Sequence, residues 1–193
     1  MDFTEGTFEE KNNRAKKMML WFGIVSLIMS FAGWTSAFVV SSTREDWLSD
    51  FQLPNAFIVS TVMVVLSSVT FVLAQKALKN NQRQLTTIWL LATLVLGIAF
   101  ITNQFLGFQQ IIDMGYNFTG PTSNVTMSYI YLIAMVHIIH VIVGLVCILV
   151  VIYNHFKQKY NATDRLGFDL ASTFWHFIDI LWVYLFLFLY FVG

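Results

Sequence analysis

Charged residues are scarce in this chain. Asp, Glu, Lys and Arg together make up only 11% of its 193 residues, whereas an ordinary soluble domain has about 25%. Turn-forming residues are also few, because the chain has just two prolines and ten glycines. These two shortages exclude an ordinary water-soluble domain.

Cysteine and excess charge of either sign are also lacking. The single cysteine, Cys147, lies within an apolar run, so no intrachain disulfide can form and the residue is expected to pack as a small buried hydrophobe. The formal net charge is zero, so no nucleic-acid partner is expected. What is abundant is hydrophobic sequence, at 57%, including 19 Phe. Phe, Leu, Ile and Val suit hydrocarbon, and the composition therefore predicts a membrane protein.

Long apolar stretches are the main feature of the sequence. Each has about 23 residues, which in a helix spans about 35 Å and crosses a hydrocarbon core of about 30 Å. Since backbone groups in lipid must be satisfied within the segment, helices are expected. We therefore predict an all-α bundle of five transmembrane helices in a single membrane domain over residues 1–193. The predicted helices are 17–40, 54–76, 86–109, 128–152 and 170–192.

Basic residues predict the orientation of this bundle. Ten of the eleven Lys and Arg residues precede the first stretch, or lie between the second and third or the fourth and fifth, and the other side of the membrane has only Arg44. Basic loops favour the cytoplasmic side. We expect a multi-pass membrane protein with its N-terminus in the cytoplasm and its C-terminus on the opposite side of the membrane. Lys17, Arg83 and Trp175, which lie near predicted inner helix ends, are candidate contacts for lipid headgroups.

Four ionisable residues fall inside predicted helices, and intramembrane charge usually faces the bundle interior. His137 and His140 are three residues apart on the fourth stretch, and His176 and Asp179 are three apart on the fifth. Each pair therefore shares one helix face. Counting residues along the helices places His140 and Asp179 at similar depth, which predicts a contact between them.

Three interpretations of these four residues remain open. The first is structural, with His and Asp side chains bonding one another or facing hydroxyls between helices. The second is a haem or metal site, because neutral imidazole is a common ligand. The third is a proton relay through His and Asp. No nucleophile–base arrangement, phosphate loop or carboxylate pair is visible in the sequence, so we expect no catalytic, cofactor-binding or metal-binding residues and a chain that works within a larger complex.

Several segments resemble subunit III of the haem-copper terminal oxidases, the cytochrome c oxidase family. TFWHFIDILWVYLFLFLYFVG, from Thr173 to Gly193, is similar to the last helix of that subunit, with its Trp-His-Phe-aliphatic-Asp run. HIIHVIVGL, from His137 to Leu145, resembles its His-x-x-His-Val-x-x-Gly helix, and Leu53–Ala74 resembles the helix with a Leu-Ser-Ser-aliphatic-Thr centre. LLATLVLGIAFITNQFLGFQQ resembles the helix before a long outer loop. The resemblance covers about residues 17–193 and fits the short five-helix bacterial form. It implies a place in the bacterial inner membrane, with the C-terminus in the periplasm.

The resemblance implies a non-catalytic subunit that supports the stability and sustained turnover of a proton-pumping oxidase. It implies haem and copper in partner chains only, namely catalytic subunit I and copper-bearing subunit II, and a bound phospholipid in this chain. The family commonly has a buried glutamate at the position of Leu27, so proton-linked chemistry by that route is not expected here. The alternatives are an accessory subunit of a nitric oxide reductase or quinol oxidase, or an independent transporter or haem-binding membrane protein.

Overall fold

The computed structural model describes residues 7–45, 47–48, 53–118, 120, 123–160 and 164–192. In this part of the chain the fold is all-α, as predicted from the sequence. All five helices are long and apolar enough to cross a membrane, which confirms the predicted class. The helices are α1 (Phe8–Ser41), α2 (Asn55–Lys79), α3 (Arg83–Asp113), α4 (Val125–Phe156) and α5 (Leu166–Val192).

Most of the helices extend beyond the apolar stretches at one or both ends. The largest difference is at the start of α1, which begins at Phe8 rather than at residue 17. Thr7 caps this end: its hydroxyl accepts from the Glu10 backbone N–H at 3.3 Å, and the Glu10 carboxylate accepts from the Thr7 N–H at 2.9 Å. This reciprocal capping box satisfies two N–H groups at the helix start. Apolar sequence marks the hydrocarbon crossing, whereas capping residues mark the helix ends.

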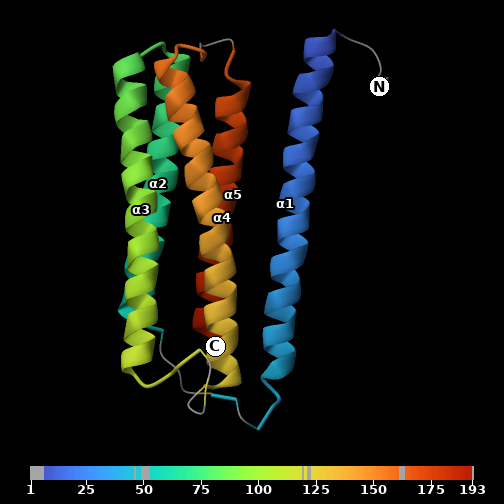
Figure 1. Ribbon diagram of the computed structural model, residues 1–193, viewed down its shortest axis with the longest axis vertical. Helices are drawn as coiled ribbons and strands as arrows, with labels where there is room; N and C mark the ends of the chain where they lie inside the picture. The colour runs from blue at the N-terminus through green and yellow to red at the C-terminus, as the bar shows by residue number, and fades with distance from the viewer. Residues whose placement is uncertain are drawn as a thin grey trace.

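Four helices form a closed ring, with the fifth outside it. α2 packs on α3, α3 on α4, α4 on α5, and α5 on α2. α1 packs only on α4 and α5 within the described residues, and Figure 1 shows it standing beside the other four helices. Much of the surface of α1 is consequently exposed, including the apolar side chains of Trp21, Phe22 and Met29.

The connections place most basic residues at one end of the bundle. α2 and α3 are joined by a tight turn in which Asn81 has a φ of 56°, a left-handed conformation that Asn tolerates better than most residues. This turn lies at the top of Figure 1, together with the start of α1 and the connection between α4 and α5. We call this the basic end, because ten of the eleven Lys and Arg residues belong to these segments.

Large aromatic side chains fill the interior of the ring. Phe100 and Trp182 meet edge to face at 5.2 Å between ring centroids, and the Trp182 and Phe57 rings stack at 6.1 Å. A glycine makes room for one of these rings, because a Cβ at Gly107 would lie 2.9 Å from Cε2 of Phe57. Small residues at helix contacts allow backbones to approach closely, as is common in membrane bundles.

Candidate functional site

His176 of α5 is bonded to a serine of α2. The hydroxyl of Ser68 lies 2.6 Å from Nδ1 of His176. Asp179, three residues further along α5, is only 4% exposed, and its Oδ2 has no hydrogen-bond partner among the described residues. The structure therefore links His176 to a neighbouring helix and buries Asp179 within the bundle.

His137 of α4 is fully buried among aromatic rings. Its imidazole centroid lies 5.0 Å from that of Trp182, 6.0 Å from that of Phe100 and 6.3 Å from that of Phe31. Among the residues that the structure describes, neither ring nitrogen of His137 has a hydrogen-bond partner. The structure thus places this residue in the bundle interior as an aromatic packing element, with no polar contact of its own.

His140 bonds within its own helix. Its Nδ1 lies 2.7 Å from the backbone oxygen of Val136, one turn earlier in α4. Its ring is half-buried and meets Phe31 of α1 edge to face at 5.8 Å. The structure therefore does not pair His140 with Asp179, which corrects that expectation. Similar depth is not enough for a contact, because the ring of His140 lies against α1 and bonds within its own helix.

Trp175 is buried at the centre of the ring, which corrects the expectation of a lipid-headgroup contact. The residue is 1% exposed, and its indole N–H donates a 2.9 Å hydrogen bond to the hydroxyl of Ser67 on α2. Glycines on two further helices make room for the ring. A Cβ at Gly97 would lie 2.8 Å from Cη2 of Trp175, and a Cβ at Gly144 would lie 2.9 Å from its Cε3. Trp175 of α5 therefore contacts α2, α3 and α4 together.

The contact between α2 and α5 has a regular pattern of hydrogen bonds. Besides Ser67, three polar residues of α2 take part, and these three are spaced seven residues apart, so they lie along one helix face. The sequence analysis considered hydroxyl groups between helices but missed this seven-residue spacing. The spacing was the feature of the sequence that could have predicted these bonds. The bonds join Thr61 Oγ1 to Trp182 Nε1 at 3.1 Å, Ser68 Oγ to His176 Nδ1 at 2.6 Å, and Gln75 Nε2 to Asp169 Oδ1 at 2.7 Å.

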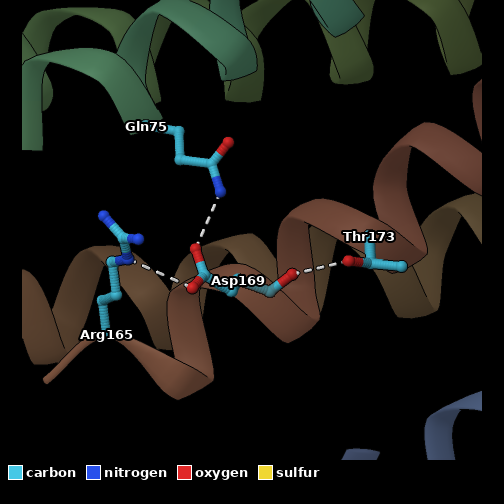
Figure 2. Close-up of polar contacts among 4 residues, drawn as sticks. All are labelled: Gln75, Arg165, Asp169 and Thr173. Atoms are coloured by element: carbon cyan, nitrogen blue, oxygen red, sulfur yellow. Dashed lines mark hydrogen bonds and ion pairs between the residues drawn. The ribbon is translucent and has the colours of Figure 1, made fainter. Parts of the chain in front are cut away.

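The last of these bonds belongs to a small polar cluster near the basic end, drawn in Figure 2. Gln75 reaches from α2 to the carboxylate of Asp169 in the first turn of α5. Arg165, just before α5, donates from its Nε to the other carboxylate oxygen at 3.2 Å, and the Thr173 hydroxyl donates to the backbone oxygen of Asp169 at 2.9 Å. A carboxylate in the first turn is also favoured by the helix dipole. The cluster fixes the start of α5 against α2.

Two more interior contacts involve residues that sequence reasoning missed. Gln104 of α3 is fully buried and donates from Nε2 to the hydroxyl of Ser60 on α2 at 2.9 Å. Nε2 of His155 lies 3.1 Å from the hydroxyl of Thr87 on α3. His155 appeared to belong to a loop, but α4 continues to Phe156 and places it against α3. These contacts add polar links between α2 and α3 and between α3 and α4.

Lys17 and Arg83 lie at the basic end with exposed side chains. Leu27 is half-buried within α1. No group of three or more His, Cys, Asp or Glu side chains is placed to hold a metal ion in the part of the chain that the structure describes.

An apolar groove of about 550 Å³ lies where α1, α4 and α5 come together toward the basic end. Leu20 contributes from α1, and the half-buried thiol residue Cys147 contributes from α4. Polar groups occur at one part of the lining, where Nδ2 of Asn154 donates to the Tyr160 hydroxyl at 3.4 Å. The groove is therefore lined mainly by hydrocarbon, with amide and phenol groups available to a polar molecule.

The sequence of this chain is similar to those of known proteins over 72% to 97% of its length. The chain is 30% identical over 190 residues to a cytochrome c oxidase subunit 3 of Alkalihalophilus pseudofirmus, covering 97% of this chain and 90% of that protein. It is 32% identical over 141 residues to a cytochrome bo(3) ubiquinol oxidase subunit 3 of Buchnera aphidicola, covering 72% and 70%. It is 32% identical over 143 residues to a cytochrome c oxidase subunit 3 of Bacillus sp. PS3, covering 74% and 67%.

The family comparison agrees with these relatives. A model of the family described as cytochrome c oxidase subunit III matches residues 3–193, a range that includes all five helices. The segments that meet at Ser67 and Ser68 are the Leu-Ser-Ser and Trp-His-Phe-Ile-Asp motifs noted in the sequence. The chain is a multi-pass membrane protein that belongs to the cytochrome c oxidase subunit III family.

Proposed function

We propose that this chain is the non-catalytic subunit III of a proton-pumping haem-copper terminal oxidase in aerobic respiration. The observation that carries the proposal is the family match over residues 3–193, which leaves no helix of the bundle outside it. Relatives covering most of the chain are named as subunits of cytochrome c oxidases and of a ubiquinol oxidase. Both kinds of electron donor are therefore compatible with the proposal.

In this proposal the redox chemistry belongs to partner chains. Catalytic subunit I holds haem and copper, subunit II holds copper, and the assembled complex reduces O2 with proton translocation. Polar side chains of the bundle interior support the assignment, because Trp175 and Ser68 bond across helices and His137 packs among aromatic rings. This chain contributes stability and sustained turnover to the catalytic subunit.

The proposed location is the bacterial inner membrane, with the basic end on the cytoplasmic side. The support is the asymmetry of Lys and Arg between the two ends of the bundle. The start of α1 then lies in the cytoplasm and the end of α5 in the periplasm. In this orientation Lys17 and Arg83 are the proposed contacts for cytoplasmic lipid headgroups, because their positive charges attract anionic lipids.

A phospholipid is the proposed occupant of the groove between α1, α4 and α5. The groove has an apolar lining suited to acyl chains, and Asn154 and Tyr160 supply polar groups suited to a headgroup or ester. Its lining includes Asn154 near the end of α4 and Gly167 at the start of α5, which corresponds to the inner leaflet in the proposed orientation. Mass spectrometry of the native protein released from mild detergent should detect a retained phospholipid, and replacing Val146 and Val150, which line the groove, by Trp should lower its occupancy.

Removal of this chain from its native organism tests the proposed role. Membranes that lack it should still consume O2 through the oxidase at first, and the rate should then fall during continued turnover faster than in the wild type. Re-expression of the chain should restore sustained turnover. An oxidase with unchanged initial rate and unchanged durability in the deletion strain would contradict the proposal.

A further inference from the structure

An amide-lined groove lies between the start of α2 and the end of α3, at the end of the bundle opposite to the basic end (Figure 1). Two adjoining cavities of about 450 and 400 Å³ form this groove, and Asn55, Gln110 and Asp113 line both of them. The side chains of these three residues make no hydrogen bond or ion pair with other described residues. Their polar groups are therefore available to a ligand.

The shared part of the groove offers acceptors that suit a primary ammonium group. Asp113 supplies a carboxylate, and the side-chain amides of Asn55 and Gln110 each supply a carbonyl oxygen. A primary ammonium group has three N–H donors, so each of these three residues can accept one of them. None of the described residues that line the two cavities is Lys or Arg. The negative charge of Asp113 is thus left for a cation from outside the chain.

The lining disfavours other charged headgroups. A quaternary ammonium such as choline has no N–H to donate and prefers the faces of aromatic rings, but none of the described lining residues is Phe, Tyr or Trp. A headgroup with only negative charge would meet the carboxylate of Asp113 without a cation beside it. A primary amine is the cation that fits this lining best.

The groove continues along apolar surface toward the middle of the membrane. Val59 of α2 and Leu106 of α3 line its second cavity, and both are about half exposed. Asn103 lies seven residues before Gln110, or about 10 Å deeper along α3. Its Nδ2 donates to the backbone oxygen of Ala56 at 2.7 Å, and the second N–H of this amide can donate to an ester carbonyl. A molecule with an amine, esters and hydrocarbon tails matches this order of groups, whereas a lysine side chain would match only the first.

We propose that this groove binds a zwitterionic phospholipid with a primary amine, as in phosphatidylethanolamine, from the leaflet opposite to the basic end. Its ammonium group bonds to Asp113, Asn55 and Gln110, the side-chain amide of Gln109 donates to its phosphate, and its acyl chains follow the apolar part of the groove. This site is separate from the groove between α1, α4 and α5, because the two grooves share no lining residue.

Native mass spectrometry of the full-length chain released from phospholipid vesicles tests this site. The vesicles contain equal amounts of phosphatidylethanolamine, phosphatidylcholine and phosphatidylglycerol with the same acyl chains. The wild type should retain phosphatidylethanolamine in preference to the other two, and Asp113→Asn should lower this retention about two- to fivefold, the modest effect of an exposed ion pair. Glu45→Gln is the matched control, because Glu45 lies in the connection at the same end but lines neither cavity.

Filling the groove gives a second readout. Val59→Trp should lower the retention of phosphatidylethanolamine, whereas Val62→Trp should not, because Val62 is similarly exposed on α2 but lines neither cavity. Val146→Trp, in the groove between α1, α4 and α5, should also leave this lipid bound. The exposure of Asp113, Val59 and Val62 means that their variants should fold.

Equal retention of the three lipids, or equal effects of Asp113→Asn and Glu45→Gln, would overturn the proposal. So would an Asp113→Asn chain that keeps its lipid but loses partner chains when it is purified from the native membrane. The groove would then hold a polypeptide segment in place of a phospholipid.

Discussion

The indole N–H of Trp175 and the hydroxyl of Ser67 form a 2.9 Å hydrogen bond although the two residues are 108 positions apart in the chain. The same indole lies against glycines of α3 and α4. One side chain thus contacts three other helices of the ring. The stability of the bundle should depend strongly on it.

Replacing Trp175 by Ala should lower the free energy of unfolding by about 3–5 kcal/mol, because it leaves a large cavity and an unpaired hydroxyl. Trp21→Ala is the matched control, because Trp21 is 60% exposed on α1 and its loss should change stability by less than about 0.5 kcal/mol. Reversible denaturation in mixed detergent micelles measures both. Equal effects of the two substitutions would contradict the central position of Trp175.

Adding a methyl group beside Trp175 should also destabilise the bundle. A Cβ at Gly144 would lie 2.9 Å from Cε3 of Trp175, and a Cβ at Gly97 would lie 2.7 Å from Cδ2 of Leu145. Gly144→Ala and Gly97→Ala should each lower stability by about 1–3 kcal/mol, the usual range for overpacking. Gly33→Ala on α1 is the control, because nothing lies within 4 Å of its added Cβ. Tolerance of all three changes would mean that the indole lies elsewhere.

His137 should tolerate an apolar replacement, whereas His176 should not. Both ring nitrogens of His137 are buried without a partner, so His137→Leu should be neutral or stabilising by about 1 kcal/mol. His176→Leu removes the bond to Ser68 and should lower stability by about 1–2 kcal/mol. Denaturation curves of the two variants under identical conditions make the comparison. A loss of more than about 2 kcal/mol in His137→Leu would show that its ring has a polar partner.

In the cluster of Figure 2, the amide contact should matter more than the ion pair. The side chains of Arg165 and Asp169 are 28% and 38% exposed, so solvent screens their attraction and Arg165→Ala should change stability by less than about 1 kcal/mol. Asp169→Ala also removes the bond that Gln75 makes to α5 and should have the larger effect, about 1–2 kcal/mol. A double-mutant cycle of Gln75 and Asp169 measures the free energy that their hydrogen bond contributes to the contact between α2 and α5. A coupling energy near zero would contradict the importance of this bond.

The five helices and the family motifs were accessible from the sequence because both are local properties. Twenty or so apolar residues are required at each hydrocarbon crossing, wherever the neighbouring helices lie. The start of α1 at Phe8 was also encoded locally, in Thr7 and Glu10, but an apolar pattern does not register a polar capping box. That boundary was missed because hydropathy and capping are different signals.

The contact partners of individual side chains could be predicted less well from the sequence. Trp175 lies near the beginning of an apolar stretch, which favoured an interfacial position, yet Gly97 and Gly144 on other helices provide a buried pocket for it. His140 and Asp179 matched in depth, but their contact also required matching rotation about the helix axes, and the structure directs His140 to α1 instead. Such contacts depend on how helices far apart in sequence pack together.

Isolation of the chain from its native membrane tests the central claim most directly. An affinity tag placed on this chain, followed by purification in mild detergent and a visible absorption spectrum, asks whether a haem-copper core accompanies it. The account predicts stoichiometric recovery of haem-bearing and copper-bearing partner chains, together with a haem spectrum that is absent when this chain is expressed and purified alone. Recovery of the folded chain without such a core, or a stoichiometric haem band from the chain alone, would contradict it.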